Sequence, residues 1–289
     1  MTWVTAAGFE ATGNPAFICD FSPPRSGSYE DIPSPFPDAD FLMVNRNPGR
    51  AVRADSAMLA AELQRRTGQN VIFALLTRDM NRLAVQSYLL GAQLLGLENV
   101  VVAQGDSFST SDTKRVPAVV DYRPTELIAH ISQMNQGIDF RGRKLDSPTD
   151  FCIGATVDPG QDPCRQAALA YRKLSEGAAF LITQPVYDPT HASGFMEAYE
   201  EIAGGPCLMP IYWGLQMLEE ESVAFGPVPV RLQEELAAGR SSVDLALEVY
   251  SRFLESSMGN VYLLPSIRRG GSRGYEAAQN FLTAARAMS

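Results

Sequence analysis

The stretch Phe17-Ile-Cys-Asp-Phe-Ser-Pro-Pro-Arg25 decides the fold, because it contains a buried strand and the place where that strand ends. Its first five residues form an apolar run that holds one carboxylate, Asp20. Pro23 and Pro24 lack the amide donor that a strand or helix interior needs, so the acid is expected at the end of the strand. Two interpretations of Asp20 stay open: a structural acid satisfied by backbone amides or an arginine, and a catalytic acid with a raised pKa.

Seven more runs of strand length follow, and helix-period segments separate most of them. Continuously apolar runs are typical of strands that are buried on both faces of a sheet. The eight expected strands are 17–21, 40–44, 70–75, 99–104, 151–156, 179–184, 208–212 and 261–265. The expected helices are 55–67, 81–95, 124–136, 163–176, 190–203, 228–238 with 242–254, and 275–288.

This alternation predicts an α/β protein, a (β/α)8 TIM barrel formed as a single domain by residues 1–289. Residues 22–37 are rich in proline, serine and glycine, so we expect an irregular connection after the first strand. An open doubly wound sheet is the alternative. It would usually carry a G-x-G-x-x-G turn after an early strand, and the sequence has none there.

Composition and charge narrow the function classes. The net charge of −9 argues against nucleic acid or an anionic membrane as the main partner. No apolar run approaches the roughly 20 residues of a membrane span, and the first residues lack the basic start of a signal peptide, so we expect a cytoplasmic protein. The four cysteines show no C-x-x-C spacing, so we expect reduced, buried thiols and no metal site.

Polar residues follow the expected strands, and in a barrel these carboxyl ends converge on one mouth. In chain order they are Asp20; Asn45, Arg46 and Asn47; Thr77, Arg78 and Asp79; Gln104, Gly105 and Asp106; Thr156 and Asp158; Thr183 and Gln184; Tyr212 and Trp213; and Ser266, Arg268 and Arg269. Acids, amides, arginines and an aromatic pair together suit a flat, hydrogen-bonding heterocycle with an anionic tail.

Several of these residues also have ordinary structural interpretations. Asp106 could accept a hydrogen bond from a ring amide or simply cap the turn that follows Gly105. Gln184 could bind the edge of a pterin or satisfy loop backbone. Tyr212 and Trp213 could stack on a ligand or close the core.

Three segments resemble methylenetetrahydrofolate reductases. They are Cys19-Asp-Phe-Ser-Pro-Pro-Arg25, Gln104-Gly-Asp106 and, above all, Gly177-Ala-Ala-Phe-Leu-Ile-Thr-Gln-Pro-Val-Tyr-Asp188. The later stretches Leu208-Met-Pro-Ile211 and Tyr262-Leu-Leu-Pro-Ser-Ile-Arg268 are similar to that family's last strands. The family fold is a (β/α)8 barrel, in agreement with the strand count.

The resemblance implies an activity. In that family a hydride from NADH or NADPH reduces FAD, which then reduces 5,10-methylenetetrahydrofolate to 5-methyltetrahydrofolate. It implies Asp20 as the acid that opens the imidazolidine ring and Asp106 as a second catalytic carboxylate. It implies folate contacts at Gln184 and Arg268, with Tyr212 and Trp213 as stacking candidates. The implied cofactor contacts are Asn45, Gln104, Gly105, Asp106, Thr156, Arg172 and Lys173.

Departures from the family pattern leave the cofactor open. Asp20 replaces the usual glutamate, and Gln104 replaces an arginine. The aromatic and histidine that usually follow the fifth strand are missing, and Ala74 and Leu75 stand where a histidine is usual. Three hypotheses follow: an FAD-dependent reductase, a reductase in which the nicotinamide donates hydride directly, and a non-catalytic folate-binding subunit of a one-carbon complex. We expect a homo-oligomer or a subunit of such a complex.

Overall fold

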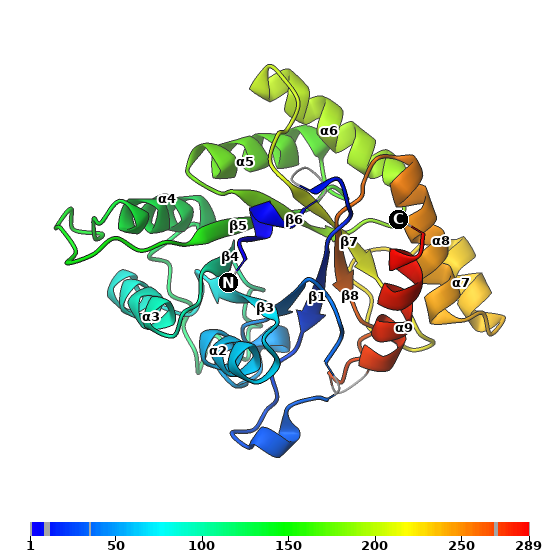
Figure 1. Ribbon diagram of the computed structural model, residues 1–289, viewed down its shortest axis with the longest axis horizontal. Helices are drawn as coiled ribbons and strands as arrows, with labels where there is room; N and C mark the ends of the chain where they lie inside the picture. Colours follow the sequence, from blue (N-terminus) through cyan, green and yellow to red (C-terminus); the bar gives the residue numbers. More distant parts are fainter. Residues whose placement is uncertain (1, 9–11, 35, 269–270, 289) are drawn as a thin grey trace.

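The computed structural model describes residues 2–8, 12–34, 36–268 and 271–288, and its centre is a closed parallel barrel (Figure 1). The strands pair in chain order, and β1 closes the barrel on β8. Their bounds are β1 (Phe17–Phe21), β2 (Phe41–Val44), β3 (Asn70–Leu76), β4 (Asn99–Ala103), β5 (Cys152–Val157), β6 (Phe180–Pro185), β7 (Ile211–Gln216) and β8 (Val261–Leu264). The predicted (β/α)8 barrel is confirmed.

Helices surround the barrel (Figure 1). They are α2 (Ser56–Thr67), α3 (Arg82–Leu94), α4 (Pro124–Asn135), α5 (Pro163–Ser175), α6 (Pro189–Ala203), α7 (Val230–Ala237), α8 (Ser242–Glu255) and α9 (Tyr275–Arg286). Short polar side chains cap the first turns of α2, α3, α5, α6 and α8; Asp55, for example, accepts from the amides of Ala57 and Met58. The connection from β1 to β2 is irregular, as the proline-rich sequence predicts, and it also holds the short 3-10 helix η2 (Tyr29–Asp31).

Two apolar layers hold the barrel together. Inward side chains such as Ile18, Ile72 and Phe180 fill the lumen, whereas the alternate positions pack against the helices. Gly154 is required on this inner face, because a Cβ there would lie 2.3 Å from the ring of Phe180. The lumen is therefore a packed core, and a ligand has room only at an end.

The amino end of the barrel is closed by the N-terminal segment. The 3-10 helix η1 (Val4–Ala6) lies across this end (Figure 1). The Val4 amide donates to Asn99 Oδ1 at 3.1 Å, and the Tyr212 hydroxyl donates to the Val4 carbonyl at 3.1 Å. Polar chemistry is therefore left to the carboxyl end, which we call the mouth.

Two sequence expectations need correction here. The seventh strand was expected at 208–212, but β7 begins at Ile211 and continues to Gln216, because Leu208 lies in an exposed loop. Buried thiols were expected throughout, but Cys164, in the first turn of α5, is exposed and Cys207 is half-buried. None of the helices that the structure describes has the length and apolar run that crossing a membrane requires.

Candidate active site

Asp20 lies on the inner face of β1, two residues after Ile18, and is fully buried. Two donors bind its carboxylate. The Asn45 amide, directly after β2, donates to both oxygens, at 3.0 Å to Oδ2. The Arg273 guanidinium donates from Nη2 to Oδ2 at 3.1 Å. The acid is therefore held between two strand ends that are adjacent in the barrel and the loop that precedes α9.

The position of Asn45 follows from the β1–β2 pairing. The backbone amide of Asn45 continues the hydrogen-bond ladder of the two strands by donating to the Phe21 carbonyl at 3.0 Å. This contact places the Asn45 side chain beside Asp20. Asn45 was expected to contact a cofactor, but in the structure its side-chain amide binds the Asp20 carboxylate.

Arg273 is the functional candidate that the sequence analysis missed. Its side chain is 5% exposed, and an antiparallel bridge between Ile267 and Arg273 fixes the turn that carries it. The only sequence signal was its place between β8 and α9, at the mouth. A buried guanidinium beside a buried carboxylate makes a charge-assisted pair in a low-dielectric site.

Burial raises the pKa of the Asp20 carboxyl, and the charge of Arg273 and the Asn45 hydrogen bond lower it, with burial the largest effect. The phenols of Tyr262 and Tyr275 are buried nearby, and burial and the Asp20 charge raise the pKa of both. Asp20 thus has the environment of an acid that can hold a proton above the usual carboxyl range.

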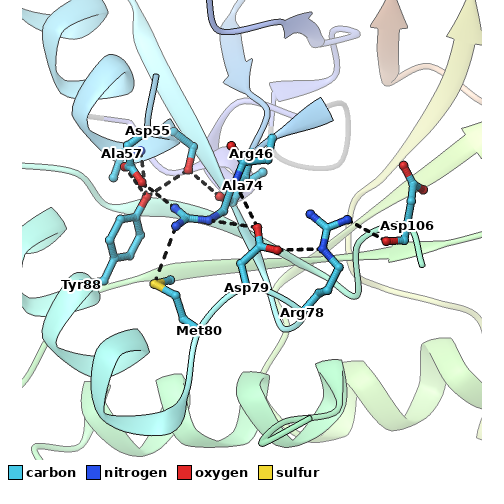
Figure 2. Close-up of polar contacts among 11 residues, drawn as sticks. Arg46, Asp55, Ala57, Ala74, Arg78, Asp79, Met80, Tyr88 and Asp106 are labelled. Carbon is cyan, nitrogen blue, oxygen red and sulfur yellow. Dashed lines mark hydrogen bonds and ion pairs between the residues drawn. The ribbon is translucent and has the colours of Figure 1, made fainter. Parts of the chain in front are cut away.

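A second polar cluster lies after β2 and β3, centred on Asp79 (Figure 2). Asp79 Oδ1 accepts from Arg78 Nε at 2.7 Å, and its Oδ2 lies 3.7 Å from Arg46 Nε. Arg46 Nη1 also donates to Asp55 at 2.7 Å, and its guanidinium lies over the Tyr88 ring. Each arginine here faces a carboxylate, so the cluster fixes the loops of the mouth.

Gln104, Gly105 and Asp106 lie directly after β4, and both Gln104 and Asp106 are exposed. Gly105 has a φ of 82°, a left-handed conformation that favours glycine. Arg78 Nη1 donates to the Asp106 carbonyl at 2.6 Å. The structure therefore holds the backbone of this turn and leaves the Asp106 carboxylate to solvent.

Three residues near β5 were expected to contact a cofactor, namely Thr156, Arg172 and Lys173, and the structure places them in different surroundings. Lys173 is buried, and its ammonium donates to the Thr156 carbonyl at 2.5 Å. Burial lowers the pKa of Lys173 to about 8. Arg172 lies in the last turn of α5 and is exposed.

Among the expected folate contacts, Gln184 is the last residue but one of β6 and is exposed, as a ligand contact requires. A Cβ at Gly214 would lie 2.6 Å from the Gln184 carbonyl, so this glycine lets the irregular end of β6 approach β7.

Tyr212 and Trp213 do not face the mouth, and this expectation was wrong. Because β7 begins at Ile211, both residues lie at its start. The Tyr212 hydroxyl is bound to Val4 at the amino end, and the Trp213 ring packs edge-on against Phe195 of α6 at 6.4 Å between centroids. Both are core residues.

Arg268 is exposed and paired, which differs from the free cation expected for an anionic tail. Its Nε donates to Glu219 Oε2 at 2.9 Å, and Ser266 donates to the other oxygen of the same carboxylate at 2.7 Å. Arg269, named with it in the sequence analysis, lies outside the described residues. The buried arginine near Asp20 is Arg273 instead.

The residues expected for FAD do not form a site that fits it. The Lys173 ammonium is directed to a carbonyl inside the wall of the barrel, and Asn45 binds Asp20. A Cβ at Gly105 would lie 3.1 Å from Leu76 and 3.5 Å from Arg78, so this turn packs closely on the end of β3 and on the Arg78 side chain. Two of the contacts expected for a flavin are thus already bound to protein groups.

Comparison with solved structures supports the fold. The chain resembles a protein described as "Uncharacterized protein from Clostridium thermocellum binds two copies of 5-methyl-5,6,7,8-tetrahydrofolic acid", with a TM-score of 0.65 and 15% identity over 96% of each chain. No curated protein matches the chain.

A family model for methylenetetrahydrofolate reductase matches residues 11–246, which include seven of the eight strands and the elements that carry Asp20, Asn45 and Gln184. Since this match spans most of the sequence, the chain belongs to the methylenetetrahydrofolate reductase family.

Proposed function

We propose that the chain binds a reduced folate at the mouth and reduces 5,10-methylenetetrahydrofolate to 5-methyltetrahydrofolate, with Asp20 as the proton donor. The observation that carries this proposal is the buried Asp20 carboxyl with its raised pKa at the end of β1. Membership of the family supports the reaction class. The folate bound by the Clostridium thermocellum protein of the same fold supports the substrate class.

The chemistry needs one proton and one hydride. Protonation of a ring nitrogen by Asp20 makes that nitrogen a better leaving group, and breaking its bond to the methylene carbon leaves an iminium ion. A hydride then adds to this carbon and gives the methyl group. NADH or NADPH becomes NAD⁺ or NADP⁺, so charge and electrons balance.

We propose that the hydride comes directly from the reduced nicotinamide. The support for this choice is the arrangement of Lys173 and Asn45, which are bound to protein groups although a flavin contact was expected of each. Gln184 is the side chain proposed to bind the pterin edge, because it is exposed at the end of β6.

The test is a turnover assay with NADH or NADPH and methylenetetrahydrofolate, run with and without added FAD. We expect product without FAD and no flavin absorbance in the purified protein. Asp20→Asn should lose most of the turnover, whereas Asp106→Asn, an exposed carboxylate, should keep most of it. Retained flavin and FAD-dependent turnover would contradict direct transfer. Absence of turnover with any donor, together with tight folate binding, would leave a binding subunit.

A further inference from the structure

A pocket opens beside Asp20, between the loop that follows β1 and the turn that precedes α9. Its volume is about 340 Å³, and its lining includes Pro23, Pro24, Arg25, Arg53, Arg273 and Tyr275. The phenol of Tyr275 accepts a hydrogen bond from the Ser22 amide at 2.9 Å, and its ring stacks on Phe21. The pocket is thus built on the end of β1 and the start of α9.

Three guanidinium groups line this pocket, and their hydrogen-bonding capacity is largely unused. Arg25 makes no hydrogen bond or ion pair with any residue that the structure describes. Arg53 donates from Nη1 to the Pro23 carbonyl at 2.8 Å, but its buried Nε has no partner within the described ranges. Arg273 binds Asp20 through Nη2, and its buried Nε is likewise unpartnered there.

The positive charges of these three arginines repel one another. The pKa of Arg53 is lowered by burial and by the charges of Arg273 and Arg25. Gly271 lies directly against this cluster, since a Cβ at that position would lie 2.7 Å from Arg53 Nη2. No carboxylate belongs to the described lining, in a chain whose net charge is −9. Unpartnered buried donors and unbalanced positive charge are both costly unless an anion satisfies them.

We propose that this pocket binds a carboxylate or phosphate group through Arg25, Arg53 and Arg273, and that the bound anion competes with Asp20 for Arg273. A guanidinium presents its donors as a planar fork that matches both kinds of oxyanion. Because Arg273 contacts Asp20 from the same pocket, its occupant changes the charge that Asp20 experiences. Weakening the ion pair between Arg273 and Asp20 favours the protonated form of Asp20. An anionic ligand therefore increases the share of Asp20 that can donate a proton, a step that rests on the proposed function.

Sulfate is a suitable first probe, because it keeps two charges over the accessible pH range. Its binding would be measured by calorimetry against chloride at constant ionic strength. We expect Arg25→Gln and Arg53→Gln each to weaken sulfate binding about tenfold or more, the effect of losing one charge-assisted contact. Arg66→Gln, which removes an exposed arginine of α2, is the matched control and should bind as the wild type does. Equal sulfate affinity in all four proteins would overturn the proposal.

Two natural sources of the anion can be separated with the same variants. One is the glutamate part of a folate, and the other is the phosphate of the nicotinamide dinucleotide. If the folate supplies the anion, 5-methyltetrahydrofolate loses affinity in Arg25→Gln, whereas a reduced pterin without the glutamate does not. If the dinucleotide supplies it, NADH loses affinity and reduced nicotinamide riboside does not.

The competition for Arg273 has its own readout. The pH dependence of stability of the wild type minus that of Asp20→Asn reports the titration of Asp20, and sulfate should move this titration to higher pH in the wild type. In Arg53→Gln the shift should be smaller. A titration that sulfate leaves unchanged would overturn the coupling. Because these measurements need no turnover, their failure is distinguishable from failure of the proposed reaction.

Discussion

Two sides of the barrel mouth use the same residue types with opposite results. The side after β2 and β3, which we call the paired side, has Arg46 and Arg78 facing Asp55 and Asp79. The side between β1 and α9, which we call the open side, has Arg25, Arg53 and Arg273 around one pocket, and of these only Arg273 binds a carboxylate, that of Asp20. On the paired side each arginine has a carboxylate as ion-pair partner, although the buried Arg46 Nε, 3.7 Å from Asp79 Oδ2, makes no hydrogen bond within the described chain. On the open side only Arg273 has such a carboxylate, and the buried Nε atoms of Arg53 and Arg273 lack hydrogen-bond partners among the described residues.

The difference teaches how to separate structural from ligand-binding charge in this fold. A balanced network offers little to an anionic ligand, because carboxylates already neutralise its positive charges. An unbalanced cluster beside a pocket holds its donors in position at a cost in desolvation free energy, and binding of an anion offsets this cost. An arginine at a strand end is therefore expected at the mouth of the barrel. Whether a carboxylate pairs with it indicates whether its role is structural or ligand-binding.

The largest expected effect comes from breaking the balance of the paired side. Asp79→Asn leaves Arg78, about nine-tenths buried, without its carboxylate, and leaves the equally buried Arg46 with Asp55 alone. We expect a loss of about 3 to 5 kcal/mol in the free energy of unfolding, as for other buried pairs that lose one partner. Urea denaturation measures it. Asp106→Asn should change stability by less than about 0.5 kcal/mol; similar losses in both variants would contradict the distinction.

The second prediction sharpens the comparison at the single acid of the open side. Asp20→Asn should cost no more than about 1 kcal/mol at neutral pH, because burial disfavours the charge that the substitution removes and the amide oxygen still accepts from Arg273.

Its pH dependence has a defined sign. The folded-state pKa of Asp20 is raised, chiefly by burial, so the folded protein holds this proton more tightly than the unfolded chain. Its contribution to stability is fully present below the unfolded carboxyl pKa and is lost as the pH rises through the folded value. The stability difference between wild type and Asp20→Asn should therefore shrink with rising pH in denaturation series. A difference that grows would show that Arg273, rather than burial, dominates the environment.

The strands could be predicted from sequence because apolar runs between capped helices leave few alternatives. Phe17–Phe21 is the clearest case, since proline ends the run at a fixed point. The seventh strand was placed too early because Leu208 and Met209 are apolar although they lie exposed in a loop. That shift moved Tyr212 and Trp213 from the start of β7 to its expected end, and so made two core residues resemble ligand contacts.

The partners within the site could not be predicted in the same way. The sequence places Asp20 and Asn45 at neighbouring strand ends, but the arginine that binds the acid lies 253 residues away in a glycine-rich turn. Arg268 and Arg273 stand in the same segment, and which of them is buried depends on the bridge between Ile267 and Arg273. Tertiary pairing of this kind leaves no local pattern in the sequence. Arg268 was therefore expected to be a cation for a ligand, although it pairs with Glu219.

The smallest expected effect is on the open side, and it completes the comparison. Arg25→Gln removes an exposed cation that has no hydrogen bond or ion pair with the described residues and that raises the electrostatic cost of Arg53. We expect the free energy of unfolding to stay within about 0.5 kcal/mol of the wild type, with a small gain at low salt where repulsion between arginines is least screened. Thermal unfolding at low and high salt measures this difference. A clear loss of stability would show that Arg25 has a structural partner, and the open side would then be balanced like the paired side.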